Sequence, residues 1–331
     1  MTKTYHVVGI GNALVDVLAH AGEDFLAEHG VEKGIMQLID TERAVELYGR
    51  IGPAQEISGG SAANTIAGIG HLGGRTAYVG KVKDDQLGTI FAHDLRAQGA
   101  DFATPMAPGS DEGETGRCII LVTPDGERSM NTYLGLSERL SAADIDAAQI
   151  ADAEWIYLEG YRFDGDESHA AFAKAIAAAK AAGGKVALTL SDPFCVDRHR
   201  DAFRRMIRED VDLLFANRAE MLSMYQTEVF DDALAQAAAE IELVACTDSA
   251  DGAHILSGEG RWHAPAVATR VVDATGAGDL FAGAFLWGLT QGHDLESCGR
   301  MGCVAASEII SHIGARAEAD LSALFRSHGL I

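Results

Sequence analysis

Short β-branched and apolar runs alternate with longer helical stretches along most of this sequence, and that alternation limits the possible folds more than any other feature. The strand-like runs are Tyr5 to Ile10, Thr76 to Gly80, Trp155 to Glu159, Lys185 to Leu190, Val211 to Ala216 and Leu243 to Thr247. The helical stretches are Ser61 to Leu72, Gln86 to Gln98, Ser168 to Ala182, Arg198 to Ile207 and Phe230 to Glu240. Such an order predicts βαβ units, and therefore an α/β fold with a doubly wound, mostly parallel sheet covered by helices on both faces.

Two regions interrupt the alternation, at about residues 13–37 and 101–133. In the second, the alternating run Arg117 to Val122 is followed by a turn at Pro124 to Gly126, as in a β-hairpin. We expect these segments to form a small β-sheet that acts as a lid on a single domain spanning residues 1–331. Strand edges in such a lid could pair between subunits, so both a monomer and a homodimer stay open.

The charge balance restricts the partners of the chain. A formal net charge of −23 would repel a nucleic-acid backbone or an anionic membrane, so we expect neither as a partner. A small molecule is the expected ligand. ATP remains compatible, because metal ions and backbone amides can supply the positive field that the side chains lack.

The cysteines and the first residues of the chain bear on the cellular compartment of the protein. The cysteines are odd in number and lack C-x-x-C spacing, which predicts buried thiols rather than a disulfide framework. The first residues contain no apolar segment of the kind a signal peptide needs, and the apolar stretch from Leu280 to Gln291 is too short to cross a bilayer. We expect a cytoplasmic protein.

The segment from Val272 to Phe285 carries the strongest chemical signal. Its turn, Gly276-Ala277-Gly278, opens an apolar helix, so unpaired amide N–H groups and the helix dipole face outward as an anion hole. Asp279 follows directly, where a carboxylate could take a proton from a hydroxyl attacking a bound phosphate. The competing interpretation is a tight loop in which Asp279 only favours the helix start.

A second glycine turn precedes another helix at Gly59 to Asn64. Gly60 and Ser61 permit close backbone approach to a ligand, and Asn64 offers a donor and an acceptor to neighbouring hydroxyls. Taken alone, such a turn more often has a purely structural role.

Together these segments resemble a known family. Gly59 to Gly74 (GGSAANTIAGIGHLGG) and Asp273 to Asp279 (DATGAGD) are similar to the two signature segments of the PfkB, or ribokinase-like, carbohydrate and nucleoside kinases. The segment Asn217 to Glu220 resembles the family's N-x-x-E element, and Val244 to Gly252 resembles its nucleotide-binding strand and turn.

The resemblance implies roles for the phosphoryl-transfer residues. Asp279 would be the general base, and Gly276, Ala277 and Gly278 the anion hole, while Arg128 would reach the transferred phosphate from the lid. ATP and Mg²⁺ are the implied cofactors, and a monovalent cation such as K⁺ stays open. The implied nucleotide-binding residues are Asn217, Thr247, Ser249, Gly252 and Gly278, with Asn217 and Glu220 also organising the metal ion. Ser249 stands where the family often has glycine, which leaves the geometry of the nucleotide loop open.

The implied acceptor is a ribose-bearing nucleoside. The G-N-x-x-x-D form from Gly11 to Asp16, together with Gln37 to Asp40 before a helix, resembles adenosine kinases more than ribokinases. The polar residues expected to bind the acceptor are Asn12, Asp16, Gln37, Gly60, Ser61 and Asn64. The apolar side would use Leu14, Tyr161 and Phe194, although core packing is the commoner fate of such residues. The aromatic pair of some adenosine kinases is not clearly reproduced near Tyr161, so ribose or fructose stays possible.

Other classes of protein fit less well. A dinucleotide-binding oxidoreductase would need a third glycine where Leu14 stands, and a Walker A loop would need lysine where Asp279 stands. A catalytically silent ligand-binding protein on the kinase fold is the alternative of a different class, and the retained Asp279 with its glycines argues against it.

Overall fold

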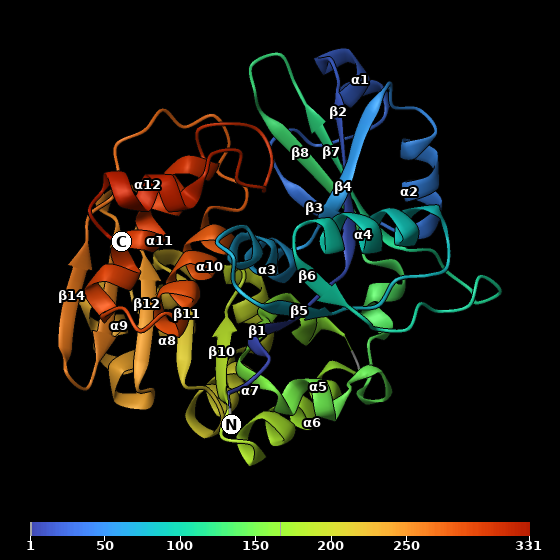
Figure 1. The fold of residues 1–331 in the computed structure, drawn as a ribbon. Coiled ribbons are helices and arrows are strands. Elements are labelled where there is room, and N and C mark those ends of the chain that lie inside the picture. Colours follow the sequence, from blue (N-terminus) through green and yellow to red (C-terminus); the bar gives the residue numbers. More distant parts are fainter. Residues whose placement is uncertain (1, 166) are drawn as a thin grey trace.

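The computed structural model describes residues 2–165 and 167–331. Strands of the larger sheet are β1 (Tyr5–Ile10), β5 (Thr76–Val79), β6 (Ala100–Phe102), β9 (Ala153–Glu159), β10 (Lys185–Thr189), β11 (Leu213–Asn217), β12 (Leu243–Thr247), β13 (Ala253–Ser257) and β14 (Gly260–Ala264). Within the described residues they form a nine-stranded sheet in the order β14-β13-β12-β11-β10-β9-β1-β5-β6 (Figure 1). Pairing is parallel from β12 through to β6, and β13 and β14 extend the other edge antiparallel.

Helices cover both faces of this sheet, which confirms the predicted doubly wound α/β fold. Their bounds are α1 (Glu23–Glu28), α2 (Thr41–Tyr48), α3 (Ser61–His71), α4 (Gln86–Ala97), α5 (Ala147–Ala151), α6 (Ser168–Ala181), α7 (Pro193–Glu209), α8 (Arg218–Tyr225), α9 (Phe230–Glu240), α10 (Ala277–Thr290), α11 (Leu295–Ile309) and α12 (Leu321–Ser327), with 3₁₀ turns η1 (Gly135–Arg139), η2 (Ala142–Asp144), η3 (Gly160–Asp164) and η4 (Ser249–Asp251). One core packs α3, α4, α10, α11 and α12 against one face, and a second core packs α5 to α9 against the other.

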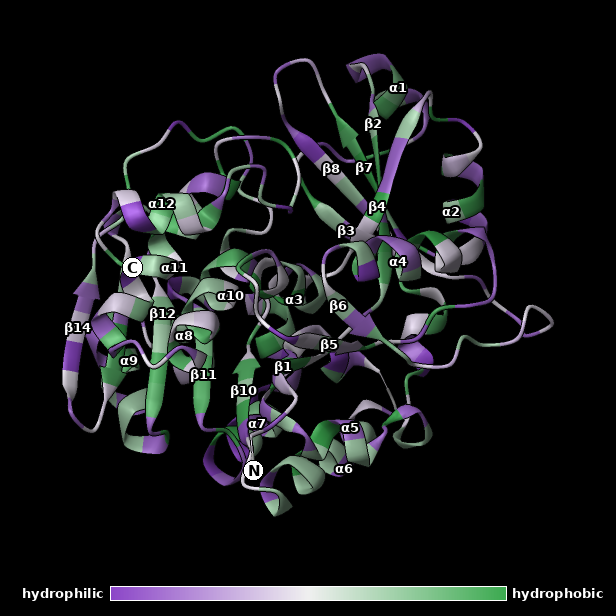
Figure 2. Ribbon diagram, viewed as in Figure 1, coloured by the Kyte–Doolittle hydropathy of each residue, from purple (hydrophilic) through white to green (hydrophobic). Residues whose placement is uncertain are grey.

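The strands of the large sheet are apolar on both sides because both faces are covered. In β1, Val7 and Val8 point to opposite faces and join different cores, and each is 0% exposed. Figure 2 shows how central and edge strands differ: the central strands β10 to β12 are hydrophobic, and the edge strand β14 is largely hydrophilic.

A second, smaller sheet stands beside the large one (Figure 1). Its strands are β2 (Leu14–His20), β3 (Met36–Leu38), β4 (Ala54–Gly59), β7 (Gly116–Val122) and β8 (Arg128–Tyr133). They form a five-stranded sheet among the described residues, in the order β3-β8-β7-β2-β4. We call it the small sheet.

The boundaries expected for the lid differ from the observed sheet in two places. β4 lies outside both expected segments yet pairs antiparallel with β2, and β6 lies inside the second segment yet pairs with β5 in the large sheet. β4 (AQEISG) grades from exposed to buried residues along its length without alternation, so no local pattern marks it as a strand. β6 is a short edge strand, and it joins the large sheet through its pairing with β5.

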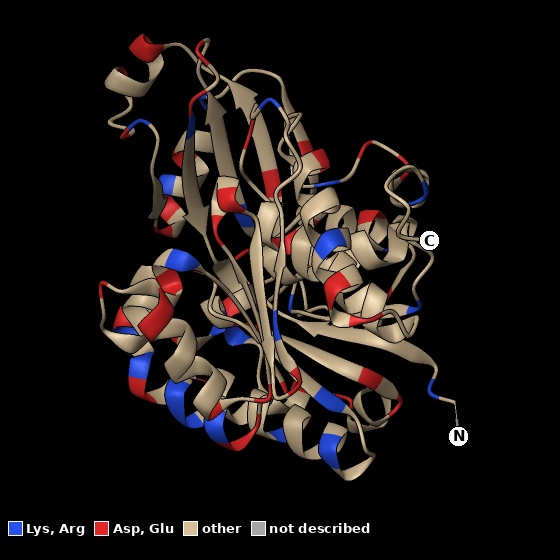
Figure 3. Ribbon diagram, turned by 90° about the vertical axis from the view of Figure 1, so that its left-hand side faces the viewer, with Lys and Arg blue, Asp and Glu red and all other residues tan. Residues whose placement is uncertain are grey.

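Carboxylates account for the net charge of −23, and Figure 3 shows them scattered over both sheets and the surrounding helices. Among the described residues, no helix is both long and apolar enough to span a membrane.

Candidate functional site

A cavity of about 1040 Å³ lies at the carboxyl ends of the parallel strands, between the large sheet and the small sheet. Ligands of open α/β sheets bind at this edge, because the strand ends and the helix N-termini converge there. The two glycine turns of the sequence, at residues 59–61 and 276–278, both reach this cavity.

Asp279 occupies the third residue of α10 and lines the cavity. One carboxylate oxygen accepts a hydrogen bond from Ser61 Oγ at 2.6 Å, and the other accepts one from Asn64 Nδ2 at 2.9 Å. Burial raises the pKa of Asp279, while these two bonds and the charge of Arg316 act in the opposite direction. Both oxygens are thus held in place, and the two glycine turns meet at this carboxylate.

The turn before α10 is open toward the cavity. Gly276 is the N-cap at φ 80°, a left-handed conformation that favours glycine, and a Cβ there would lie 2.9 Å from Ala315 Cβ. A Cβ on Gly278 would meet no atom within 4 Å. The Ala277 N–H donates to the Ala274 carbonyl oxygen at 3.3 Å, whereas the space beside Gly278 is open, so an anion can approach the start of α10 there.

The turn before α3 is crowded instead. Gly60 has φ 94°, and a Cβ there would overlap the carbonyl oxygen of Asn12. A Cβ on Gly59 would overlap the Asp16 carboxylate. Close packing at these glycines brings Asn12, Asp16 and Ser61 to one wall of the cavity.

Buried polar groups hold that wall. Glu159, at the end of β9, accepts hydrogen bonds from the backbone N–H groups of Asn12 at 3.2 Å and Ala62 at 2.8 Å. Burial raises the pKa of Glu159 to about 7 and that of Asp16 to about 6. Arg162 donates from Nη1 to Asn12 Oδ1 at 3.0 Å, which fixes the Asn12 amide.

Asn217 and Glu220 cap α8 at the far side of the cavity. The Asn217 side chain accepts from the Glu220 backbone N–H at 2.9 Å, and a Glu220 carboxylate oxygen accepts from the Asn217 backbone N–H at 2.9 Å. Burial raises the pKa of Glu220 to about 7, so a nearby cation would favour its charged form.

A magnesium ion fits this pair only with further donors. In the described part of the chain, no group of three or more His, Cys, Asp or Glu side chains could hold a metal ion. Mg²⁺ commonly binds through one or two carboxylates, with waters and substrate phosphates completing its shell, and the Asn217–Glu220 pair is compatible with that arrangement.

The structure brings most of the expected residues to the cavity. The lining includes Asn12, Leu14, Asp16, Gly60, Ser61, Asn64, Tyr161, Phe194, Asn217, Glu220, Thr247, Gly276, Ala277, Gly278 and Asp279. Phe194 lies at the rim, where 74% of it is exposed.

Other expected residues do not line it. Gln37 on β3 donates to Asn131 Oδ1 at 2.7 Å, away from the cavity. Arg128 on β8 is buried in an ion pair with Asp273 at 2.7 Å. Ser249 and Gly252 form the η4 turn, beyond the part of the cavity that Thr247 lines.

Sequence reasoning missed three charged side chains. Glu159 ends an expected strand, so its place at the sheet edge could have been read from the pattern. Arg162 and Arg316 have no such signal, because their partners lie far away along the chain.

Comparisons with known proteins find kinases of similar sequence and fold. A family model described as pfkB family carbohydrate kinase matches residues 34–321. A probable sugar kinase from Rhizobium etli is 47% identical, with a TM-score of 0.92 over 99% of this chain and 100% of that one. Adenosine kinase from Sinorhizobium meliloti is also 47% identical, with a TM-score of 0.90 over 98% of this chain and 99% of that one. Adenosine kinase from Saccharomyces cerevisiae is 26% identical over 94% of this chain and 96% of its own length.

The matched segment includes both glycine turns, the Asn217–Glu220 pair and Asp279, and the structural matches cover nearly the whole chain. The chain belongs to the pfkB family of carbohydrate kinases and is an ATP-dependent phosphotransferase with an alcohol group as acceptor.

Proposed function

We propose that this kinase phosphorylates the hydroxymethyl group of a ribose-bearing nucleoside, with adenosine as the preferred acceptor. The observation that carries the proposal is the position of Asp279. Its carboxylate, held by Ser61 and Asn64, lies on the same cavity as a polar wall suited to ribose and an apolar wall suited to a base.

Asp279 is the general base in this proposal. It accepts the proton of the acceptor hydroxyl as the oxygen attacks the terminal phosphate of ATP. Hydrogen bonds from Ser61 and Asn64 leave the carboxylate in one orientation, so little reorganisation is needed when the proton moves.

The amides of Gly276, Ala277 and Gly278 would bind the phosphate oxygens whose charge changes during transfer. Mg²⁺, held through Asn217 and Glu220, would neutralise phosphate charge when bound. Thr247 also lines the cavity, and we assign it to nucleotide binding together with the adjoining turn of Ser249 and Gly252.

The walls of the cavity favour a nucleoside over a small sugar. Asn12, Asp16 and Asn64 offer donors and acceptors to ribose hydroxyls. The small sheet and its surroundings also line the cavity with an apolar surface of a kind that a flat base would cover. Its residues are Leu14, Ile35, Met36, Leu38, Ile120, Met130, Leu134 and Phe194.

Charge in the cavity favours a neutral acceptor. Its acidic lining residues are Asp16, Glu159, Asp164, Asp192, Glu220 and Asp279. Arg198 is the basic residue that lines it in the described part of the chain, and it is already bound to Asp164 through two hydrogen bonds of 3.0 and 2.6 Å. A phosphorylated sugar would therefore meet repulsion without a free cation to offset it.

A sugar kinase accepting ribose or fructose is the second candidate. It is supported by the equal identity, 47%, of the probable sugar kinase and the adenosine kinase found among solved structures. A silent ligand-binding protein would have no use for a base held by two directed hydrogen bonds beside an open helix N-terminus.

The lid is part of the proposal. Closure of the small sheet would exclude water, which otherwise competes as phosphoryl acceptor. Arg128, now paired with Asp273, lies on the small sheet and would join the phosphate site on closure. ATP hydrolysis without acceptor should then be slow, and a rate comparable to acceptor phosphorylation would contradict lid closure.

A coupled assay of ADP release with adenosine, ribose and fructose tests the acceptor, with Asp279→Asn as the inactive control. We expect kcat/KM to be highest for adenosine. Higher kcat/KM for ribose or fructose would establish the sugar kinase instead. Adenosine that raises the melting temperature without any ADP release would indicate the silent binding protein.

A further inference from the structure

Arg316 lies outside the family signature segments, in the loop between α11 and α12, yet its side chain contacts Asn64, which donates to the base. The guanidinium donates from Nη1 to Asn64 Oδ1, and from Nη2 to the carbonyl oxygen of Ser58 at 2.6 Å and to Ser58 Oγ at 2.8 Å. Ser58 and Asn64 stand on either side of the glycine turn before α3. Arg316 therefore ties that turn to the C-terminal part of the chain.

This contact decides which way the Asn64 amide points. Because Oδ1 accepts from Arg316, Nδ2 is the group that faces Asp279, where it donates at 2.9 Å. The flipped amide would place its oxygen against the carboxylate and its NH₂ against the guanidinium, and both contacts would be repulsive. Arg316 thus acts on the base through Asn64.

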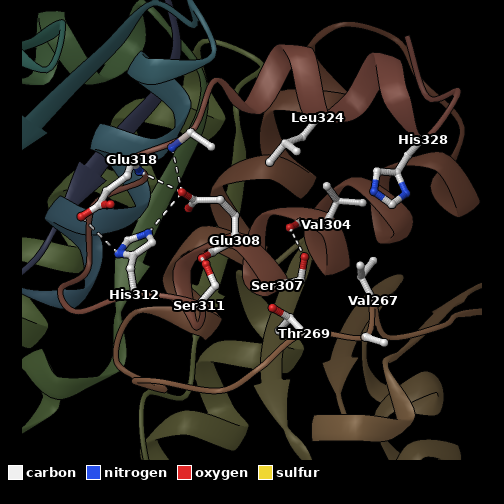
Figure 4. Close-up of a pocket in the computed structure, with 12 residues that line it drawn as sticks. Val267, Thr269, Val304, Ser307, Glu308, Ser311, His312, Glu318, Leu324 and His328 are labelled. Atoms are coloured by element: carbon white, nitrogen blue, oxygen red, sulfur yellow. Dashed lines mark hydrogen bonds and ion pairs between the residues drawn. The ribbon is translucent and has the colours of Figure 1, made fainter. Parts of the chain in front are cut away.

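The loop that carries Arg316 is itself fixed at both ends. Gly314 N–H donates to Asp273 Oδ2 at 3.1 Å, at the start of the turn before α10. On the other side, Glu308 accepts from the backbone N–H groups of Glu318 at 2.9 Å and Ala319 at 2.8 Å, as Figure 4 shows. Such anchoring keeps a guanidinium in place without help from a ligand.

The positive charge of Arg316 lies among mostly acidic groups. The groups that interact electrostatically with the Arg316 guanidinium are Asp16 on β2, Tyr78 on β5, Asp94 on α4 and Asp279 on α10. The titratable or charged groups that interact electrostatically with Asp279 from neighbouring elements are Asp16, Tyr157 and Glu159 on β9, Tyr161 on η3, Glu220 on α8 and Arg316. Arg316 is the cation among them, opposite an otherwise acidic set.

We propose that Arg316 is a positioning residue of this kinase, which holds Asn64 in the orientation that donates to Asp279 and supplies positive charge beside the base. The proposal rests on the assignment of Asp279 as base, and it holds for any acceptor.

The first test is kinetic and compares Arg316→Met with Arg326→Met, a control at an exposed arginine on α12. Loss of a hydrogen-bonded charge predicts a fall in kcat of about 10- to 100-fold in Arg316→Met. KM for ATP should be unchanged, because Arg316 does not line the cavity. The acid limb of kcat/KM should move to higher pH by roughly one unit, since a lost cation raises the pKa of a carboxylate. A lower kcat with an unmoved acid limb would overturn the proposal.

Conservative and double variants keep the proposal testable if Arg316→Met folds poorly. Arg316→Lys retains the charge but lacks the planar fork, so the acid limb should stay near that of the wild type while kcat falls. In the Asn64→Ala background, either substitution at Arg316 should cost less than it does alone, because the residue acts through Asn64. Fully additive losses would contradict the proposal.

A second test needs no substrate. Carboxyl-carbon NMR of the free protein follows the titration of Asp279, with the signal assigned from Asp279→Asn. We expect this titration to move to higher pH in Arg316→Met and to stay in place in Arg326→Met. An unchanged titration in Arg316→Met would overturn the role of Arg316, whereas a wild-type protein inactive on every acceptor would refute only the proposed function.

Discussion

The two glycine turns at the cavity look alike in sequence and differ in structure. Before α3, Gly60 is packed so closely that a Cβ would overlap Asn12, and the turn serves to bring side chains to the acceptor wall. Before α10, a Cβ on Gly278 would meet open space, and the turn leaves room for an anion at the start of the helix. The glycine turn before α3 is needed for packing, and the one before α10 for phosphate access. Substitutions in the first should therefore lower fold stability, and substitutions in the second should weaken phosphate binding.

The largest effect is expected at Asp279, where the two turns meet. Asp279→Asn should lower kcat by about 100- to 10,000-fold with little change in KM, because only proton transfer is lost. Steady-state kinetics with the accepted substrate measures this. As control, Asp294→Asn changes the N-cap acid of α11, where asparagine caps equally well, and should leave kcat intact. A raised KM with unchanged kcat in Asp279→Asn would show that this carboxylate binds but is not the base.

The crowded turn should respond next. Gly60→Ala should lower the free energy of unfolding by about 3 kcal/mol, because a left-handed φ and an overlap with Asn12 both oppose the side chain. Denaturant unfolding measures the loss. Gly183→Ala is the matched control, since Gly183 also has positive φ, 70°, but no atom within 4 Å of its Cβ position. That variant should lose only about 1 kcal/mol, and equal losses would mean that crowding at Gly60 is unimportant.

The open turn should give the opposite pattern. Gly278→Ala replaces a helical glycine, so the free energy of unfolding should rise by about 0.5 kcal/mol. The added methyl group would stand where phosphate approaches the amides, and kcat/KM for ATP should fall roughly tenfold. Denaturant unfolding and steady-state kinetics on the same preparation test the predicted gain in stability and the predicted loss in kcat/KM. An unchanged kcat/KM would place the phosphate elsewhere.

The smallest effect concerns pH at the acceptor wall. Burial raises the pKa of Asp16 to about 6, so the carboxylate is charged above that pH and becomes protonated as the pH falls through it. Protonation weakens it as a hydrogen-bond acceptor, and KM for the acceptor should rise a few-fold below pH 6. In Asp16→Asn this dependence should disappear. A KM that falls on acidification would exclude Asp16 from acceptor binding.

Local pattern was enough for much of this molecule. Alternation of strands and helices predicted the large sheet, because each element carries its own periodicity of apolar residues. Gly276 to Asp279 predicted an anion site with a carboxylate beside it, since a glycine turn and a helix N-terminus are adjacent in sequence. Glu159 could also have been found, as the last residue of a predicted strand.

Other features arise only when distant segments pack together. β4 pairs with β2 through backbone hydrogen bonds that its non-alternating sequence does not signal. Gln37 and Arg128 carry suitable chemistry, but pairing within the small sheet and with Asp273 turns them away from the cavity. Arg316 meets Asn64 across 252 residues of chain. Local sequence thus set the elements and the phosphate turn, whereas the orientation of the base was decided by tertiary contacts, because hydrogen bonds between remote side chains leave no periodic trace in the sequence.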